Sequence, residues 1–335
     1  MIPWHDARRV CVIMPTWIGD ICMATSALHL IRERIGPNGH VVALVRSEFE
    51  SLLHGLDSVN GFDSMPQKGL FGPWRNGRII ASHDPDTVLV LPGSFRSALT
   101  AKLSGARTRI GYAQDGRRML LSHAINHPPR NPPMNQVARY CQLVDPDTTP
   151  PMPVLKVTAQ DQQAAMPIQE KLGDSYALLV PGANRLDKRW PEDRFAAVAK
   201  ALHESYGLTP VISASPSERE MSAHLAAKIG RHCIDLAAAQ VSISALKSLV
   251  SRASCAITND TGPRHMAITL GVPVISLFGP TDHRWTMVPG AMETRLVANP
   301  FLNEQQIADD HSEVCQITRI GVSDVLSAIH ALGIK

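Results

Sequence analysis

Long apolar runs, a large charge surplus and paired cysteines are all missing from this sequence of 335 residues. The longest apolar runs, residues 87–91 and 272–278, fall far short of the roughly 20 residues that a membrane-spanning helix needs. Lys and Arg exceed Asp and Glu by only +3, too little to drive nucleic-acid binding through counterion release. The six cysteines contain no C-x-x-C pair, which argues against a zinc ribbon or a disulfide framework and favours a reducing compartment.

Several common catalytic motifs are absent as well. No G-x-G-x-x-G follows a predicted strand, and G-x-x-x-x-G-K-[ST], H-E-x-x-H and G-x-S-x-G do not occur. The sequence therefore lacks the signatures of dehydrogenases, P-loop proteins and the common hydrolases. The apolar stretch at residues 10–14 is also too short for a signal-peptide core, so we expect no export.

The pattern that is present predicts an α/β fold. Short runs rich in Val, Ile and Leu alternate with helical periodicity, as in buried parallel strands joined by crossover helices. We predict strands at residues 10–14, 41–45, 87–91, 108–111, 177–180, 209–213, 233–235, 256–258 and 274–277. We predict helices at residues 20–35, 49–55, 95–104, 136–144, 194–206, 218–229, 242–251, 263–270 and 322–332.

A proline-rich region divides the chain into two halves. Eight of the 25 prolines lie between residues 128 and 153, where they disfavour continuous helix. We therefore expect a Rossmann-like domain over residues 1–155, a connector over 156–173, and a second Rossmann-like domain over 174–320. The final helix, in residues 321–335, is free to pack on either domain. Two such doubly wound domains facing across a cleft are expected to bind a ligand between them.

The first loop with chemical potential is Pro15-Thr16-Trp17-Ile18-Gly19-Asp20, which follows the first strand. A carboxylate at this edge of the sheet is placed to act as a general base. Asp is also a common N-cap that accepts hydrogen bonds from the first turn of a helix. Both roles fit Asp20 at this stage.

The second loop, residues 180–191, leaves the first strand of the second half. Arg185, Lys188 and Arg189 place three cations beside Gly182, a combination that suits a diphosphate. A solvated charged loop explains the same composition equally well.

The third and fourth loops follow the last two predicted strands. In Asn259-Asp260-Thr261-Gly262-Pro263-Arg264-His265, a strand ends and a helix begins at proline, which creates an anion site at the helix start. Asp260 or Thr261 acting only as a cap, with His265 as an ordinary helix residue, is the simpler interpretation. Phe278-Gly279-Pro280-Thr281-Asp282 lines the same pocket or merely turns the chain.

Basic residues concentrate between positions 96 and 130. Seven Arg and Lys side chains stand there against the single acid Asp115. Such a surplus suits an acidic or phosphorylated acceptor or an anionic bilayer, although scattered solvent-exposed arginines give the same count.

Taken together, these motifs resemble a known family. Trp17-Ile18-Gly19-Asp20 with Thr25, Asp187-Lys188-Arg189-Trp190-Pro191, Asn259-Asp260-Thr261-Gly262 with His265, and Phe278-Gly279-Pro280-Thr281 occur in that order. The combination is similar to the lipopolysaccharide heptosyltransferases of glycosyltransferase family 9, and its first motif is most similar to heptosyltransferase II. The resemblance covers residues from about 10 to about 285.

The resemblance implies a GT-B fold and an inverting glycosyltransferase that moves heptose from ADP-heptose to the Kdo/heptose-lipid A inner core. It implies Asp20 as the general base, a metal-independent reaction and no cofactor beyond the donor substrate. Donor-binding residues are then Lys188, Arg189, Asn259, Asp260, Thr261, Gly262, His265 and Thr281. For the acceptor we expect Gly19, Arg96, Arg117 and Arg118. We expect no nucleic-acid partner, and a cytoplasmic enzyme that contacts the inner membrane peripherally.

Two positions depart from the family pattern. Ser26 stands where many members have proline, and Pro263-Arg264 replaces the residues usual before the histidine. An arginine at this position is long enough to reach the donor or the acceptor, and the sequence leaves its role open. Three alternatives remain open: a family member with another donor or acceptor, a non-catalytic nucleotide-sugar-binding protein, and a nucleotide-sugar epimerase. Asp20 together with Lys188 favours an enzyme over a binding module, and no motif supports the epimerase.

Overall fold

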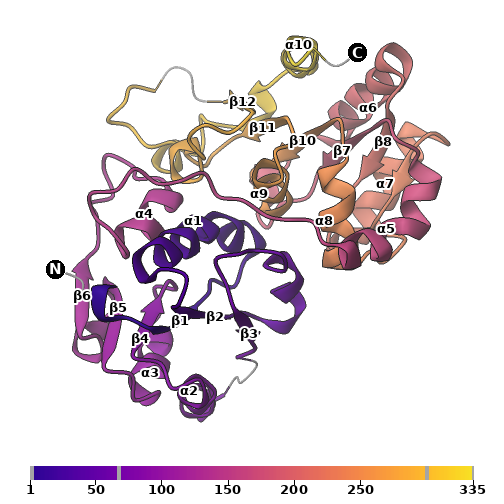
Figure 1. The fold of residues 1–335 in the computed structure, drawn as a ribbon. Helices are drawn as coiled ribbons and strands as arrows, with labels where there is room; N and C mark the ends of the chain where they lie inside the picture. The colour runs from indigo at the N-terminus through magenta and orange to yellow at the C-terminus, as the bar shows by residue number, and fades with distance from the viewer. Residues whose placement is uncertain (1–3, 66–68, 299–301, 334–335) are drawn as a thin grey trace. The chain divides into compact units, whose positions relative to one another are not determined.

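The computed structural model describes residues 4–65, 69–298 and 302–333 (Figure 1). The chain divides into two compact units, one of residues 1–130 and 134–156 and the other of residues 131–133 and 157–335. Each unit contains one six-stranded sheet. The α/β class predicted from the sequence is confirmed.

The sheet of the first unit is entirely parallel, with strand order β3-β2-β1-β4-β5-β6. Its strands are β1 (Arg9–Ile13), β2 (His40–Leu44), β3 (Gly61–Asp63), β4 (Thr87–Val90), β5 (Thr108–Ala113) and β6 (His123–Asn126). Its helices are α1 (Ile18–Ile35), α2 (Gly72–Ser82), α3 (Phe95–Leu103) and α4 (Gln136–Gln142). This is the strand order of Rossmann-type sheets, which bind ligands where the order reverses, here between β1 and β4.

Helices cover both faces of this sheet, with α2 and α3 on one side and α1 and α4 on the other (Figure 1). Ile80 of α2 and Ala98 of α3 pack against Cys11, Val42 and Val88 of the strands. All four residues of β4 are buried, as expected for a central strand sandwiched between two helical layers.

The second unit repeats the same topology. Its parallel sheet has the order β12-β11-β10-β7-β8-β9. Read from the β9 edge, with β7 counted as the first strand, this is the same order as in the first unit. The strands are β7 (Tyr176–Val180), β8 (Thr209–Ile212), β9 (Ile234–Asp235), β10 (Cys255–Asn259), β11 (Val274–Phe278) and β12 (Glu293–Val297). The helices are α5 (Ala159–Leu172), α6 (Glu192–Tyr206), α7 (Arg219–Ile229), α8 (Ile243–Ser251), α9 (Gly262–Thr269) and α10 (Val322–Ala331). The reversal point lies between β7 and β10.

The residues expected to form a connector, 156–173, consist largely of helix α5. Thr158 and Asp161 form a capping box at its start, and the Asp161 carboxylate lies 2.9 Å from Lys247 Nζ of α8. Both side chains are buried, so α5 is a packed element of the second unit rather than a free link. Helix α10, whose packing the sequence left open, contacts α6 in this unit.

Two hydrogen bonds to α1 hold residues 151–154, near the end of the first unit. Ser26 Oγ donates to the Pro151 carbonyl at 2.7 Å, and Thr25 Oγ1 accepts from the Val154 N–H at 3.0 Å. The serine that departs from the family pattern therefore serves packing between α1 and the returning chain. Within the described part of the chain, no helix has the length and apolarity to span a membrane, and all six cysteines are free thiols.

Candidate active site

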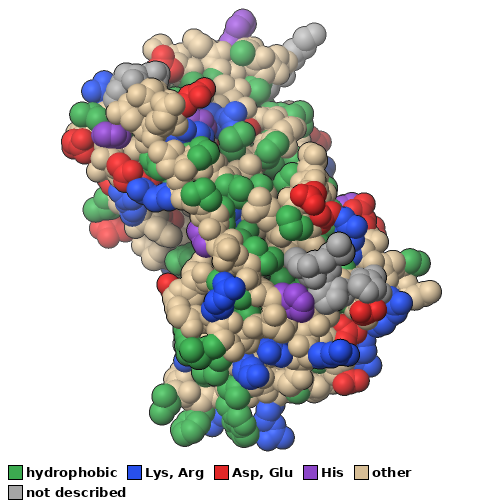
Figure 2. Space-filling model, turned by 90° about the vertical axis from the view of Figure 1, so that its left-hand side faces the viewer, with side chains coloured by type: hydrophobic (Ala, Val, Ile, Leu, Met, Phe, Trp, Pro, Cys, Tyr) green, Lys and Arg blue, Asp and Glu red, His purple; other side chains and the backbone are tan. Residues whose placement is uncertain are grey.

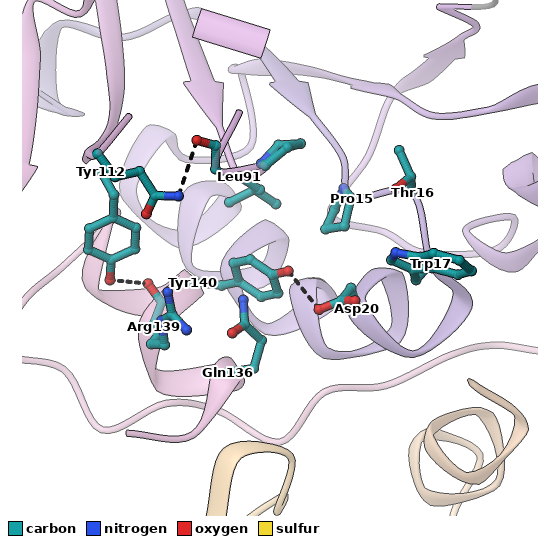
Figure 3. Close-up of a pocket in the computed structure, with 12 residues that line it drawn as sticks. Pro15, Thr16, Trp17, Asp20, Leu91, Tyr112, Gln136, Arg139 and Tyr140 are labelled. Atoms are coloured by element: carbon teal, nitrogen blue, oxygen red, sulfur yellow. Dashed lines mark hydrogen bonds between the residues drawn. The ribbon is translucent and has the colours of Figure 1, made fainter. Parts of the chain in front are cut away.

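A pocket of about 250 Å³ opens in the first unit at the reversal point of its sheet (Figure 3). Its walls come from the loops after β1 and β4, from the end of β5, and from helices α1 and α4. The lining residues are Pro15, Thr16, Trp17, Asp20, Leu91, Pro92, Gly93, Tyr112, Gln114, Gln136, Arg139 and Tyr140. The position agrees with the rule that open α/β sheets bind ligands beyond the carboxyl ends of their strands.

Asp20 is the third residue of α1, and it is not the residue that caps this helix. The N-cap is Trp17, which makes no side-chain capping bond. The Asp20 side chain lines the pocket and accepts a hydrogen bond from Tyr140 Oη at 3.0 Å (Figure 3). It is the acidic residue of the first turn, where the helix start carries partial positive charge. The capping interpretation offered for Asp20 is therefore wrong.

Tyr140 projects from α4 onto the first turn of α1. It is buried, and both burial and the neighbouring Asp20 carboxylate hold the pKa of its phenol well above its ordinary value. The phenol is thus a proton donor at any physiological pH. This bond holds one oxygen of a carboxylate that lines the pocket.

Sequence reasoning missed the contribution of α4. Gln136, Arg139 and Tyr140 all line the pocket, yet the sequence pattern predicts only a helix over residues 136–144 and points to none of its residues as part of a site. Positions three and four residues apart share one helical face, so this spacing was the available signal. Arg139 lies with its guanidinium carbon 6.0 Å from the centre of the Tyr112 ring and is the only Lys or Arg among the lining residues.

The four residues expected at the acceptor lie outside this pocket lining. Gly19 is buried in the first turn of α1. Arg117 is fully buried and donates to the carbonyls of Tyr112 at 2.7 Å and of Ser94 at 3.3 Å. Arg96 and Arg118 are exposed, and they donate to Gly69 O and Asn126 Oδ1. Arg117 therefore supports the loop after β4 instead of facing solvent.

In the second unit, charged side chains meet at the end of β10. Lys188 Nζ lies 3.1 Å from Asp260 Oδ2, and Thr286 Oγ1 donates to Asp260 Oδ1 at 3.1 Å. Although burial opposes ionisation of Asp260, the Arg264 and Lys188 charges hold the pKa of this carboxyl below its ordinary value. Lys188, from the loop after β7, thus stands at the reversal point of the second sheet, in front of the start of α9.

Arg264 does not reach outward. Its side chain is completely buried and lies 2.6 Å from Glu293 Oε1 and 3.3 Å from Asp260 Oδ1. Its guanidinium carbon also stacks 4.8 Å from the centre of the Phe278 ring. Arg264 therefore holds Asp260 and Glu293 from the buried side of the site and is closed to solvent.

Other expected donor-site residues serve the local frame. Asn259 accepts from the Trp190 N–H at 3.2 Å and donates to the Pro181 carbonyl at 2.7 Å, which joins the ends of β7 and β10. Arg189 donates to the Ala183 carbonyl at 2.9 Å. Thr261 is the N-cap of α9 but makes no side-chain capping bond, and Gly262 is its first residue.

His265 and Thr281 each bury a polar atom that has no hydrogen-bond partner among the described residues, Nδ1 and Oγ1 respectively. Burial and the Arg264 charge lower the pKa of His265 to about 3, so its ring is neutral. His265 Nε2 lies 3.1 Å from Arg264 Nη1, which indicates that the ring proton is on Nδ1. Across the described residues, no three His, Cys, Asp or Glu side chains cluster to hold a metal ion.

These two Rossmann-type units, each with charged side chains at its reversal point, define an α/β protein built to bind polar ligands. The family model described as glycosyltransferase family 9 (heptosyltransferase) matches residues 74–315. The chain belongs to this family and is a glycosyl-transferring enzyme. The resemblance found in the sequence motifs is confirmed.

Relatives agree with this assignment. Lipooligosaccharide heptosyltransferase 2 of Haemophilus influenzae is 28% identical over 299 residues, covering 83% of this chain and 85% of the relative. Lipopolysaccharide heptosyltransferase 2 of Escherichia coli is 26% identical and covers 83% and 84%. The solved structure of the E. coli ADP-heptose heptosyltransferase II shares the fold, with a TM-score of 0.82, 23% identity and coverage of 97% and 98%.

Proposed function

We propose that this protein is an inverting heptosyltransferase that moves heptose from ADP-heptose to the Kdo/heptose-lipid A inner core of lipopolysaccharide. The observation that carries the proposal is the Asp20 carboxylate, which lines the first unit's pocket and is held by Tyr140 in a chain of family 9. The names of the relatives support the choice of donor and acceptor. We further propose the GT-B arrangement, with residues 1–155 binding the acceptor and residues 174–320 binding the donor.

Asp20 is the general base of the proposed reaction. Its carboxylate takes the proton of an acceptor hydroxyl while the hydroxyl oxygen attacks the anomeric carbon of the donor. The bond from this carbon to the ADP oxygen breaks on the opposite face, so the anomeric configuration inverts and ADP leaves with the electron pair. A carboxylate hydrogen-bonded at one oxygen is oriented for this step before substrate arrives.

The donor site is proposed at Lys188, Arg189, Asn259, Asp260, Thr261, Gly262, His265 and Thr281. An ammonium has three N–H groups, and the Asp260 carboxylate accepts from one of those on Lys188, so others are available for phosphate oxygens. Backbone N–H groups at the start of α9 add a second stabilising element for an anion. Donors fixed around the leaving diphosphate lower the barrier without a metal ion, which is the metal-independent reaction proposed here.

We place the enzyme in the cytoplasm, in peripheral contact with the inner membrane that carries its lipid-linked acceptor. The test is to incubate the protein with ADP-heptose and a panel of other nucleotide sugars, each with Kdo- or heptose-bearing lipid A, and to analyse the product by mass and by NMR. Transfer from ADP-heptose with an inverted anomeric centre supports the proposal. Transfer from a different donor, or retention of configuration, contradicts it, and tight ADP-heptose binding without turnover on either acceptor contradicts the proposed acceptor.

A further inference from the structure

Helices α2 and α3 present an outer face that is both apolar and basic. Five large hydrophobic side chains are exposed there: Leu70 (88%), Phe71 (66%), Trp74 (50%), Phe95 (45%) and Leu103 (42%). Figure 2 shows hydrophobic and basic side chains gathered at the lower end of the molecule, where α2 and α3 lie in Figure 1. Single exposed hydrophobic residues are ordinary, but a group of this size marks an interaction surface.

These side chains lie on adjacent segments because the two helices touch. A Cβ added at Gly77 of α2 would lie 3.0 Å from the Leu103 carbonyl carbon, so any larger residue there would press the two helices apart. At the other end, Arg96 of α3 donates to the Gly69 carbonyl at 2.7 Å. The residues just before α2 are thereby held beside the start of α3. We call the exposed residues of both segments the α2–α3 face.

The charge of the α2–α3 face has one sign. Neither residues 69–82 nor residues 93–107 contain an Asp or Glu. The exposed basic side chains are Arg75, Arg78, Arg96, Lys102 and Arg107. Arg78 lies over the Trp74 ring, with its guanidinium carbon 5.2 Å from the ring centre. Of the acids that follow α2, Asp86 accepts from the backbone N–H of Arg9, and the exposed Asp84 lies 3.9 Å from Arg9 Nη1.

We propose that the α2–α3 face docks this protein on an anionic lipid bilayer. Trp and Phe prefer the depth of the headgroups, aliphatic side chains enter the acyl boundary, and Arg and Lys bind the phosphates. Each cation near such a surface strengthens binding roughly fivefold. A second copy of the chain is a poorer occupant, because a two-fold dimer through this face would oppose five cations with five cations. The inference rests on the proposed function for its biological role, since a lipid-linked acceptor lies at a membrane surface.

The test is flotation of the full-length protein with vesicles made of an equal mixture of phosphatidylglycerol and phosphatidylcholine, and with vesicles of phosphatidylcholine alone. Two double variants remove the two parts of the surface: Phe71→Ser with Trp74→Ser, and Arg75→Glu with Arg78→Glu. All four positions are exposed, so circular dichroism and the melting temperature should stay close to those of the wild type. A matched control, Met166→Ser with Lys171→Glu, removes one exposed hydrophobic residue and one exposed cation on α5.

We expect the wild type and the α5 control to float with the anionic vesicles and much less with the neutral ones. Both α2–α3 variants should lose binding at least about tenfold, which corresponds to about 1.4 kcal/mol, and added salt should weaken wild-type binding. Equal flotation of all four proteins, or equal binding to both vesicles, overturns the proposal. The proposal is also overturned if the α2–α3 variants still float but lose a concentration-dependent dimerisation, or an oligonucleotide binding, that the wild type shows.

A second readout separates this inference from the proposed function. Heptose transfer to a delipidated, water-soluble acceptor should be unchanged in both α2–α3 variants, because none of the four positions lines the pocket. Loss of flotation with no transfer activity in any of the proteins upholds the docking surface and contradicts the proposed function. Full transfer activity with no flotation of the wild type upholds the proposed function and contradicts the docking surface.

Discussion

Replacing Tyr140 by phenylalanine removes one hydroxyl from the first unit and tests whether this residue acts through Asp20. The ring and its packing between α1 and α4 are retained, whereas the 3.0 Å bond from Oη to Asp20 Oδ1 is lost. A hydrogen bond to an ionised group contributes about 1.5–3 kcal/mol. The ionised form of Asp20 should therefore lose about this much stabilisation relative to its protonated form.

The direction of the pH effect follows from this loss. A general base works only when deprotonated, so the acid limb of kcat/KM against pH should move to higher pH, with about a 10- to 100-fold loss of kcat/KM at the acid end. Above that limb the loss should be smaller, because a carboxylate of higher pKa is also a stronger base. Deprotonation of Tyr140 does not contribute in the assay range, since its pKa lies well above its ordinary value.

The assay is ADP release over a pH series for the wild type, Tyr140→Phe and Tyr112→Phe. Tyr112 is the matched control, because it lines the same pocket but its hydroxyl donates to the Arg139 carbonyl at 2.6 Å. Its loss should leave the acid limb in place. Adding Tyr140→Phe to Asp20→Asn should cost little more than Asp20→Asn alone. A wild-type acid limb in Tyr140→Phe, or full additivity of the two changes, would refute the reasoning.

Three further predictions concern the second unit. Lys188→Ala should weaken ADP binding about 10- to 100-fold by calorimetry, with partial recovery in Lys188→Arg; unchanged affinity removes Lys188 from the donor site. Arg264→Met leaves Glu293 buried without its partner charge and should lower the free energy of unfolding in urea by about 3–5 kcal/mol. Adding Glu293→Gln should restore part of this loss. A loss below about 1 kcal/mol contradicts the buried pair. The pKa of His265 is about 3, so below pH about 6.5 the unfolded chain binds a proton at this residue that the folded chain does not. The free energy of unfolding should therefore fall as the pH drops below about 6.5. The fall should be smaller in His265→Gln.

The central strands were predictable because burial on both faces demands continuous apolar runs. Strand β4 is an example, since each of its residues is apolar or Thr and buried. The edge strands β3, β6 and β12 were missed, because they are half-covered and carry polar residues such as Asp63 and His123. Helix α5 was missed for a similar reason, because its polar composition and Pro167 resemble a linker. Its capping box was the one local signal of a helix start.

The candidate site was only partly predictable. Loops after parallel strands are identifiable because all such strands end at the same edge of the sheet, which brought Asp20 and Lys188 forward. The bond between Tyr140 and Asp20 joins residues 120 positions apart, and no local pattern encodes such a contact. Arg117 and Arg264 show the opposite difficulty, because arginine in a sequence indicates solvent, and only the packed structure reveals that both are buried.

The most direct test of the central claim is the rate of heptose transfer from ADP-heptose to Kdo- or heptose-bearing lipid A by the wild type and by Asp20→Asn. Asparagine keeps the shape of the side chain and an oxygen that accepts from Tyr140, so the fold and substrate binding should survive. The proposed mechanism predicts turnover by the wild type and a loss of at least about 100-fold in kcat for the variant, with little change in KM for the donor. Transfer by Asp20→Asn at the wild-type rate would contradict the assignment of Asp20 as the general base.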